Sequence, residues 1–142
     1  MVIVLDTNVI ISALLSPAGP SANIINHWEA NEFEVVVSRQ LIIELEKVIK
    51  YPKITKYFKI SPELIAAFIR SYMKVATIVE PMDNLDVITE DPADNIVLEC
   101  AVSGNANFIV TGDKHLLNIK AYHGIVILPP AGFVRLLEMK TK

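Results

Sequence analysis

Two short apolar segments of this 142-residue chain each lead into an aspartate. Asp6 follows Val2–Leu5 directly, and Asp113 comes three residues after Asn107–Val110. If the two segments are neighbouring parallel strands, their carboxyl ends meet at the edge of the sheet where α/β proteins bind ligands. Each aspartate can alternatively cap the helix that follows it. The spacing therefore predicts either a pair of functional acids or two helix caps.

Two further carboxylates, Glu44 and Asp94, lie on apolar faces of predicted helices. The neighbours that define these faces are Leu41, Leu45 and Val48 for the first, and Val97, Leu98, Ala101 and Val102 for the second. A carboxylate on a core-facing side is costly without a partner, although a glutamate at the edge of the face can reach water. Asp91 is expected to cap the N-terminus of the helix that has Asp94 in its first turn. Asp94 is therefore the preferred functional acid of the two, and Asp91 comes second.

The four acids Asp6, Glu44, Asp94 and Asp113 cannot converge without compensation. Two unit charges ~5 Å apart repel by about 3 kcal/mol at an effective dielectric constant near 20. Such a cluster must take up protons or cations, and all-oxygen ligands favour Mg²⁺ or Mn²⁺. The residues that would favour zinc instead are scattered: His27, His115, His123 and Cys100. A carboxylate-held divalent ion suits phosphate chemistry, and no glycine-rich nucleotide-binding loop is present.

The elements that would position these acids alternate between strands and helices. The predicted strands are Val2–Leu5, Glu34–Val37, Ala76–Val79, Asn107–Val110 and Ile125–Leu128. The predicted helices are Ala22–Ala30, Gln40–Lys50, Pro62–Lys74, Ala93–Ser103 and Ala131–Met139, with a further helix ending before the Ser16–Pro20 break. Ser38 and Ser61 are predicted N-caps. The alternation predicts one domain over residues 1–142, with a parallel sheet covered by helices on both faces.

Composition narrows the class of protein. Hydrophobic residues make up 52% of the chain and charged residues 20%, which favours a folded domain. No apolar run reaches the roughly 20 residues of a membrane span, and the N-terminus lacks the basic region of a signal peptide. The single cysteine, Cys100, excludes a disulfide framework and indicates a reducing, cytoplasmic setting. The net charge of −3 argues against a nucleic-acid partner unless cations neutralise the acids.

Four segments together give the chain its resemblance to a known family. They are Leu5–Val9 (LDTNV), Ser38–Leu45 (SRQLIIEL), Asp91–Asn95 (DPADN) and Val110–Leu117 (VTGDKHLL). In this order and over nearly the whole chain, they resemble the PIN domain, and in particular the small single-domain PIN proteins known as toxins of toxin–antitoxin pairs. The resemblance implies a three-layer α/β/α sandwich with a mostly parallel central sheet of about five strands.

The resemblance also implies roles for individual residues. Asp6, Glu44, Asp94 and Asp113 would bind Mg²⁺ or Mn²⁺. The supporting polar residues near the metal or the phosphate would be Asn8, Ser38 and Thr111. The implied activity is endonucleolytic cleavage of single-stranded or loop RNA by water attack on phosphorus. The implied partners are an RNA substrate and a cognate antitoxin, and the apolar composition, with the frequent dimers among relatives, favours a homodimer.

Candidate substrate contacts and rival functions remain open in the sequence. Lys53, Lys56 and Lys114 could touch phosphates, or they could be solvated surface residues. A metal-dependent phosphatase or phosphotransferase with Asp6 as nucleophile is a rival, although such enzymes usually carry a second aspartate where Asn8 stands. A phosphoacceptor receiver domain would need paired acids near the N-terminus, which are absent. A non-catalytic RNA- or protein-binding module, in which the acids only cap helices, is the remaining alternative.

Overall fold

The computed structural model describes residues 1–56, 61–81 and 91–140. Its strands are β1 (Val2–Leu5), β2 (Glu34–Ser38), β3 (Thr77–Val79), β4 (Phe108–Val110), β5 (Ala121–Tyr122) and β6 (Ile125–Leu128). Its helices are α1 (Thr7–Leu15), α2 (Pro20–Glu29), α3 (Arg39–Ile49), α4 (Pro52–Thr55), α5 (Pro62–Val75), α6 (Pro92–Ser103), α7 (Lys114–Ile119) and α8 (Pro130–Lys140). The predicted alternation of strands and helices is confirmed.

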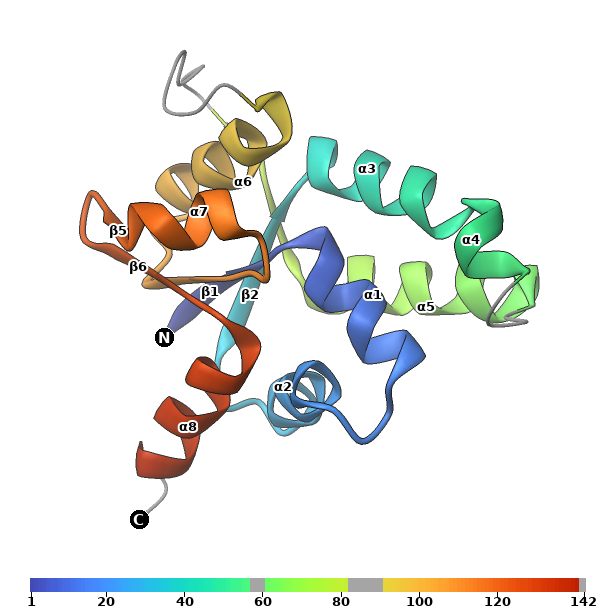
Figure 1. Cartoon of the computed structure of the whole chain (residues 1–142), viewed down its shortest axis with the longest axis horizontal. Helices are drawn as coiled ribbons and strands as arrows, with labels where there is room; N and C mark the ends of the chain where they lie inside the picture. The colour runs from blue at the N-terminus through green and yellow to red at the C-terminus, as the bar shows by residue number, and fades with distance from the viewer. Residues whose placement is uncertain (57–60, 82–90, 141–142) are drawn as a thin grey trace.

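The six strands form one sheet in the order β3-β2-β1-β4-β6-β5. All neighbours are parallel except β5 and β6, which are antiparallel. Figure 1 shows α6 and α7 on one side of this sheet and α1 and α2 on the other, with α8 beside α2. The fold is therefore the predicted helix-covered, mostly parallel sheet, with six strands instead of about five.

The unpredicted strand β5 is a two-residue edge strand. It turns back onto β6 through His123 and Gly124, whose φ angles are 51° and 80°. Positive φ at both central residues is what a two-residue hairpin turn requires. Two strand residues are too few to produce a readable hydrophobic period. The sequence does not predict the helices α4 and α7 either, because four and six residues are too few to show a helical period.

The core lies where the strands are covered on both faces. Ile3, Val4, Leu98, Ile109 and Phe133 are fully buried, which explains why the strands have continuous apolar runs instead of alternation. Cys100 is buried as a small hydrophobic residue. Trp28 packs edge-on against Tyr72, with ring centroids 5.5 Å apart. Within the described residues, no single helix could span a membrane; α1 and α2 meet the length and hydropathy criteria only as a pair, and they are bent by 97°.

Strand register sets the position of the acids. Leu5 of β1 pairs with Val110 of β4, so the residues that follow these strands, Asp6 and Thr111, are neighbours at the carboxyl edge of the sheet. The Asp6 backbone N–H donates to the Val110 carbonyl across 3.0 Å. At the other side of β1, β2 ends at Ser38, whose hydroxyl accepts from the Leu41 N–H and caps α3. This capping was predicted, as was that of α5 by Ser61.

Candidate functional site

Asp6 and Asp113 are joined by the hydroxyl of Thr111. Thr111 Oγ1 donates to Asp6 Oδ2 across 2.6 Å and accepts from the Asp113 N–H across 3.0 Å. Thr111 is fully buried, and both of its hydrogen bonds are partly buried. One threonine therefore fixes two acids that are 107 positions apart in the sequence. The predicted supporting position of Thr111 is consistent with this geometry.

The first turn of α6 adds two more carboxylates. Asp91 caps the helix by accepting from the Ala93 N–H across 3.0 Å. Asp94 lies three residues later, is only 3% exposed and shares a hydrogen bond with Asp113. Its second oxygen, Oδ2, is buried without a hydrogen-bond partner in the described part of the chain. The prediction that Asp94 points toward the sheet is thus confirmed, and it leaves a polar atom in need of a ligand.

Asp91, Asp94 and Asp113 together form a cluster that could hold a metal ion. One carboxylate oxygen from each lies within 4.8 Å of the other two. At this spacing the three carboxylates could hold one divalent cation between them. An all-carboxylate donor set suits a hard divalent cation. Asp94 Oδ2, which is buried and has no partner among the residues described, fits the role of a ligand to such an ion.

Burial and mutual repulsion perturb the protonation of these acids. Burial, the hydrogen bond with Asp113 and the surrounding negative charges raise the pKa of Asp94 to about 7. The same hydrogen bond lowers the pKa of Asp113, so Asp94 is the donor to the Asp113 carboxylate. Burial also raises the pKa of Asp6, against the hydrogen bond from Thr111. Without a cation, the cluster therefore holds a proton that a metal ion would displace.

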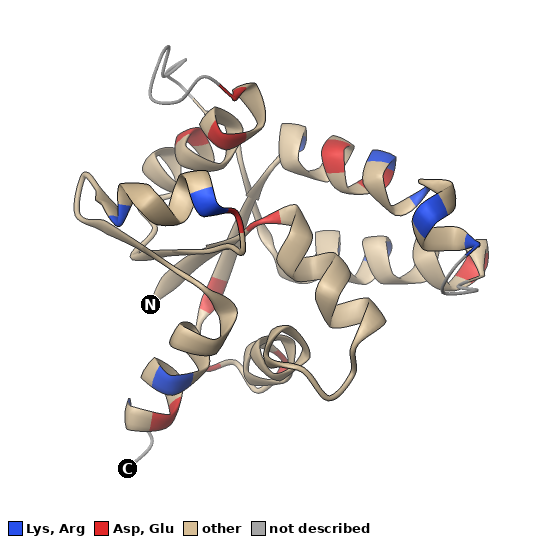
Figure 2. Ribbon diagram, in the orientation of Figure 1, with Lys and Arg blue, Asp and Glu red and all other residues tan. Residues whose placement is uncertain are grey.

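Glu44 lies at the margin of this acidic field. It is half-buried on α3, and burial followed by the charges of Asp6 and Asp91 raises its pKa, while Lys47 lowers it. Figure 2 shows acidic residues where α1 and α7 begin, on the first turns of α6 and on α3. The structure thus brings all four predicted acids into one electrostatic neighbourhood. The tightest group nevertheless contains Asp91 in place of Asp6 and Glu44.

The sequence places Asp91 second to Asp94 because helix capping explains Asp91 nearly completely and Asp94 less well. Capping engages one Asp91 oxygen, Oδ1, and a carboxylate has a second oxygen to offer. The signal that could have found it is the Asp91–Asp94 spacing of three residues, which places two side chains on one helical face. A cap and a metal ligand are therefore compatible roles for Asp91.

The other predicted supporting residues lie less centrally. Ser38 contacts Leu41 and Cys100, and Asn8 is exposed on α1. Lys114 is exposed beside Asp113, at the start of α7. Lys53 and Lys56 lie at α4, beyond the end of α3 that is remote from the acids (Figure 1). The predicted metal or substrate contacts of these residues remain predictions. Residues 57–60 of the lysine-rich stretch lie outside the described residues.

Comparison with known proteins identifies the family. A family model described as PIN domain matches residues 2–115, a range that includes every acid of the site. The chain belongs to the PIN domain family. Its fold is also similar to that of a chain in the crystal structure of VapBC2 from Rickettsia felis bound to a DNA fragment from their promoter. That match has a TM-score of 0.62 and 13% sequence identity, and covers 91% of this chain and 98% of the other.

At 13% identity, the likeness to the VapBC2 chain concerns the fold alone. No curated protein matches the chain. The family assignment therefore rests on the PIN domain match, and the chemistry has to be argued from the acidic cluster itself.

Replacing Thr111 with valine should loosen the site without removing an acid. Valine has the same shape but offers no hydroxyl, so Asp6 loses a partly buried hydrogen bond and the Asp113 N–H loses its acceptor. We expect a loss of about 1–3 kcal/mol in the free energy of unfolding and a 10–100-fold weaker affinity for Mn²⁺. Chemical denaturation and isothermal titration would measure the two effects. Thr111→Ser keeps the hydroxyl and should retain most of the Mn²⁺ affinity; equal affinities of the valine and serine variants would contradict this positioning role.

Proposed function

We propose that this PIN-domain protein is a metal-dependent endoribonuclease that cleaves single-stranded RNA or loops in structured RNA. The observation that carries the proposal is the buried Asp94 Oδ2, which has no hydrogen-bond partner in the part of the chain that the structure describes. Asp94 belongs to a group of three carboxylates whose oxygens lie within 4.8 Å of one another. Buried carboxylates clustered at this spacing are tolerated when a divalent cation compensates them. Phosphodiester hydrolysis is the chemistry that such a site best serves.

The residues of the chain divide the work between holding the metal and keeping its ligands in place. Asp94 and Asp113 would bind the cation with Asp91 and Asp6, and Glu44 would add negative charge at the margin. A bound Mg²⁺ or Mn²⁺ would supply an activated water and offset charge on the scissile phosphate. Thr111 and the backbone N–H of His115, which donates to Asp113 Oδ1 across 2.9 Å, keep the carboxylates oriented. Water is the nucleophile, so no covalent enzyme intermediate forms.

The test is cleavage of a mixed set of single-stranded RNAs by the pure protein in Mn²⁺ or in EDTA. We expect cleavage only with the metal, and loss of cleavage in Asp6→Asn and Asp113→Asn. Attack by water leaves a simple phosphate at one new end. A 2′,3′-cyclic phosphate product would contradict this mechanism, and equal cleavage by the wild type and both variants would locate the activity elsewhere.

A protein partner is the second part of the proposal. The structurally similar chain comes from a structure of VapBC2 bound to DNA. We propose that this protein is the toxin of a toxin–antitoxin pair and self-associates as a dimer. Co-expression with the product of an adjacent small open reading frame should yield a stable complex with lower RNA cleavage. A complex that cleaves RNA as fast as the free protein would reject inhibition by that partner.

A further inference from the structure

Positive and negative charges are segregated along the chain. Residues 39–75 contain eight of the 13 Lys and Arg residues but only three of the 16 Asp and Glu residues. The described part of this segment is α3, α4 and α5, which extend as an arm away from the sheet in Figure 1. Figure 2 shows basic residues toward the end of this arm. A protein with a net charge of −3 therefore carries a basic surface at the end of the arm that is remote from its acidic site.

The lysines of the arm are available for a ligand. Lys50, Lys53 and Lys56 are exposed, and the ion pairs found among the described residues are His27–Glu32 and Arg39–Glu80. The aromatic ring of Tyr51 lies between two of these lysines in sequence, and the residue is 44% exposed. Unpaired cations next to an exposed aromatic ring are the elements of a surface that binds single-stranded nucleic acid.

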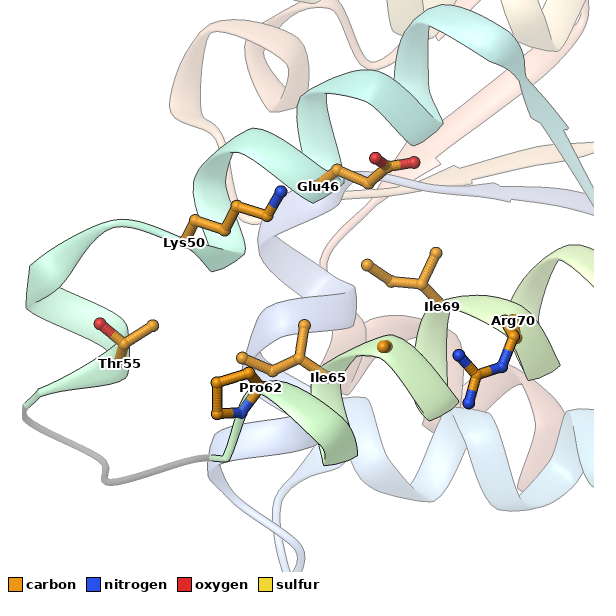
Figure 3. Close-up of a pocket in the computed structure, with 8 residues that line it drawn as sticks. Glu46, Lys50, Thr55, Pro62, Ile65, Ile69 and Arg70 are labelled. Atoms are coloured by element: carbon orange, nitrogen blue, oxygen red, sulfur yellow. The ribbon is translucent and has the colours of Figure 1, made fainter.

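The arm also forms an open cavity of about 410 Å³ between α3–α4 and α5. Figure 3 shows Glu46 of α3 and Lys50, the residue that ends this helix, on one side of it and Arg70 of α5 on the other. The lining between them is mostly apolar and includes Ile65 and Ile69. A nucleotide base is a flat ring with polar groups at its edge and a phosphate attached. Such a ligand matches an apolar lining with charged residues at its margin.

α3 connects this arm directly to the acidic site. Its residue Glu44 is within electrostatic reach of Asp6 and Asp91, and Lys50 lies six residues later, about 9 Å along the helix axis. This is a distance that a flexible strand can cross within a few nucleotides. A strand with its scissile phosphate at the acids would therefore have phosphates that lie a few nucleotides farther along beside the lysines of the arm.

We infer that the α3–α4–α5 arm binds the RNA strand that flanks the cleavage site. Lys50, Lys53 and Lys56 bind its phosphates, and one unpaired base enters the cavity next to Glu46 and Arg70. This inference rests on the proposed nuclease function and assigns its substrate as single-stranded RNA. An acidic protein segment fits the arm less well, because Glu46 on the rim repels carboxylates, whereas a base amino group can donate to it.

The experiment measures the affinity for a fluorescent 12-nucleotide single-stranded RNA by anisotropy in EDTA, at several salt concentrations. EDTA stops metal-dependent cleavage, so binding is measured apart from the activity. The test variant combines Lys50→Gln, Lys53→Gln and Lys56→Gln. Its matched control combines Lys120→Gln, Arg135→Gln and Lys140→Gln on α8 and at the end of α7. Glutamine is a good helix former, so both variants should fold.

We expect the arm variant to bind RNA at least tenfold more weakly at low salt than the control variant. The slope of log affinity against log salt should fall by about 2, because each phosphate contact on a single strand contributes ~0.7. Restoring the charges with arginine at the same three positions should restore the slope. Equal affinities and slopes for the arm and control variants would overturn the inference.

A second variant tests the cavity separately from the charges. Ala66 lines the cavity and is exposed, so Ala66→Phe should fill it without removing a cation. We expect an affinity loss of about fivefold or more, the effect of losing one base contact, with the salt slope unchanged. Ser71→Phe, on the same helix but outside this cavity, is the control, and equal binding by the two phenylalanine variants would reject the base site.

Two outcomes separate this inference from the nuclease proposal. Binding that depends on the arm, in a protein that does not cleave RNA in Mn²⁺, would support the arm and reject the nuclease. Cleavage in Mn²⁺ with no arm-dependent binding or change in KM would do the reverse. A poly-glutamate peptide is added as a competitor, and competition equal to that of RNA at the same charge would overturn the assignment to RNA.

Discussion

Replacing Asp94 with asparagine is expected to reduce Mn²⁺-dependent RNA cleavage by at least a hundredfold. Asp94 is the most buried acid of the cluster, and its Oδ2 has no hydrogen-bond partner among the described residues. Losing a residue that merely supports a metal ligand costs about 10–100-fold, so losing a ligand should cost more. The effect is measured as kcat/KM at several Mn²⁺ concentrations.

The control for this variant is Glu29→Gln, the same loss of charge at an exposed residue of α2. It should retain wild-type activity. Asp91→Asn distinguishes the structural cluster from the set of acids predicted from the sequence. If Asp91 is a ligand as well as a cap, this variant should show weaker Mn²⁺ binding. A fully active Asp94→Asn variant would remove the acidic cluster as the centre of the reaction.

The second large effect is a loss of stability in the metal-free protein as the pH rises from 5 to 8. The pKa of Asp94 is raised to about 7 in the folded state, against about 3.9 in an unfolded chain. The folded state therefore binds the proton more tightly, and this contribution is complete below pH 4 and lost as the pH rises through 7. The change corresponds to about 4 kcal/mol at most, and the raised pKa values of Asp6 and Glu44 act in the same direction.

Asp113 does not cancel this effect in the same pH window. Its pKa is lowered, so it is ionised in both the folded and the unfolded state above pH 5, and its stabilising contribution is lost only at lower pH. Thermal unfolding in EDTA at pH 5 and pH 8 measures the difference, at roughly 2–4 °C per kcal/mol for a chain of this size. Asp94→Asn should flatten the pH profile and exceed the wild type in stability at pH 8.

In EDTA at pH 8, Asp94→Asn is expected to be more stable than the wild type; with Mn²⁺, the wild type should be the more stable of the two. A ligand at 100 times its Kd adds about 2.7 kcal/mol to the free energy of unfolding, and the gain should be larger at pH 8, where fewer protons compete for the carboxylates. The wild type should gain this stability and Asp94→Asn should not. A wild-type melting temperature that is the same with Mn²⁺ and with EDTA at pH 8 would contradict a metal site.

The local pattern of apolar and polar residues was sufficient to predict most helices and strands and the side of a helix on which single residues lie. The limits of β1 and β6 follow from their apolar runs and match the structure at every residue. Asp94 was expected to face the sheet because of its apolar neighbours on α6, and it does. These features depend on residues within one or two turns of each other, and helical and strand periodicity report such short-range relations directly.

The sequence alone also led to the PIN domain resemblance that the family match confirms. It placed Asp6 and Asp113 at strand ends but left open whether each was a functional acid or a helix cap. Asp113 does cap α7 through the His115 N–H, and it also lies in the acidic cluster. Cap and site were treated as alternatives, although a carboxylate has enough oxygens for both.

Only the tertiary structure decided which acids meet and what holds them together. The strand order places β4 beside β1, and this brings Thr111 against Asp6 across 105 positions of sequence. It also determined that Asp91 joins Asp94 and Asp113 more closely than Glu44 does, because the carboxylates of the first turn of α6 lie next to Asp113, which caps α7. The cavity between α3 and α5 likewise depends on how two helices pack. Distances between residues far apart in the chain are set by the packing of whole elements, which no local pattern of residue types encodes.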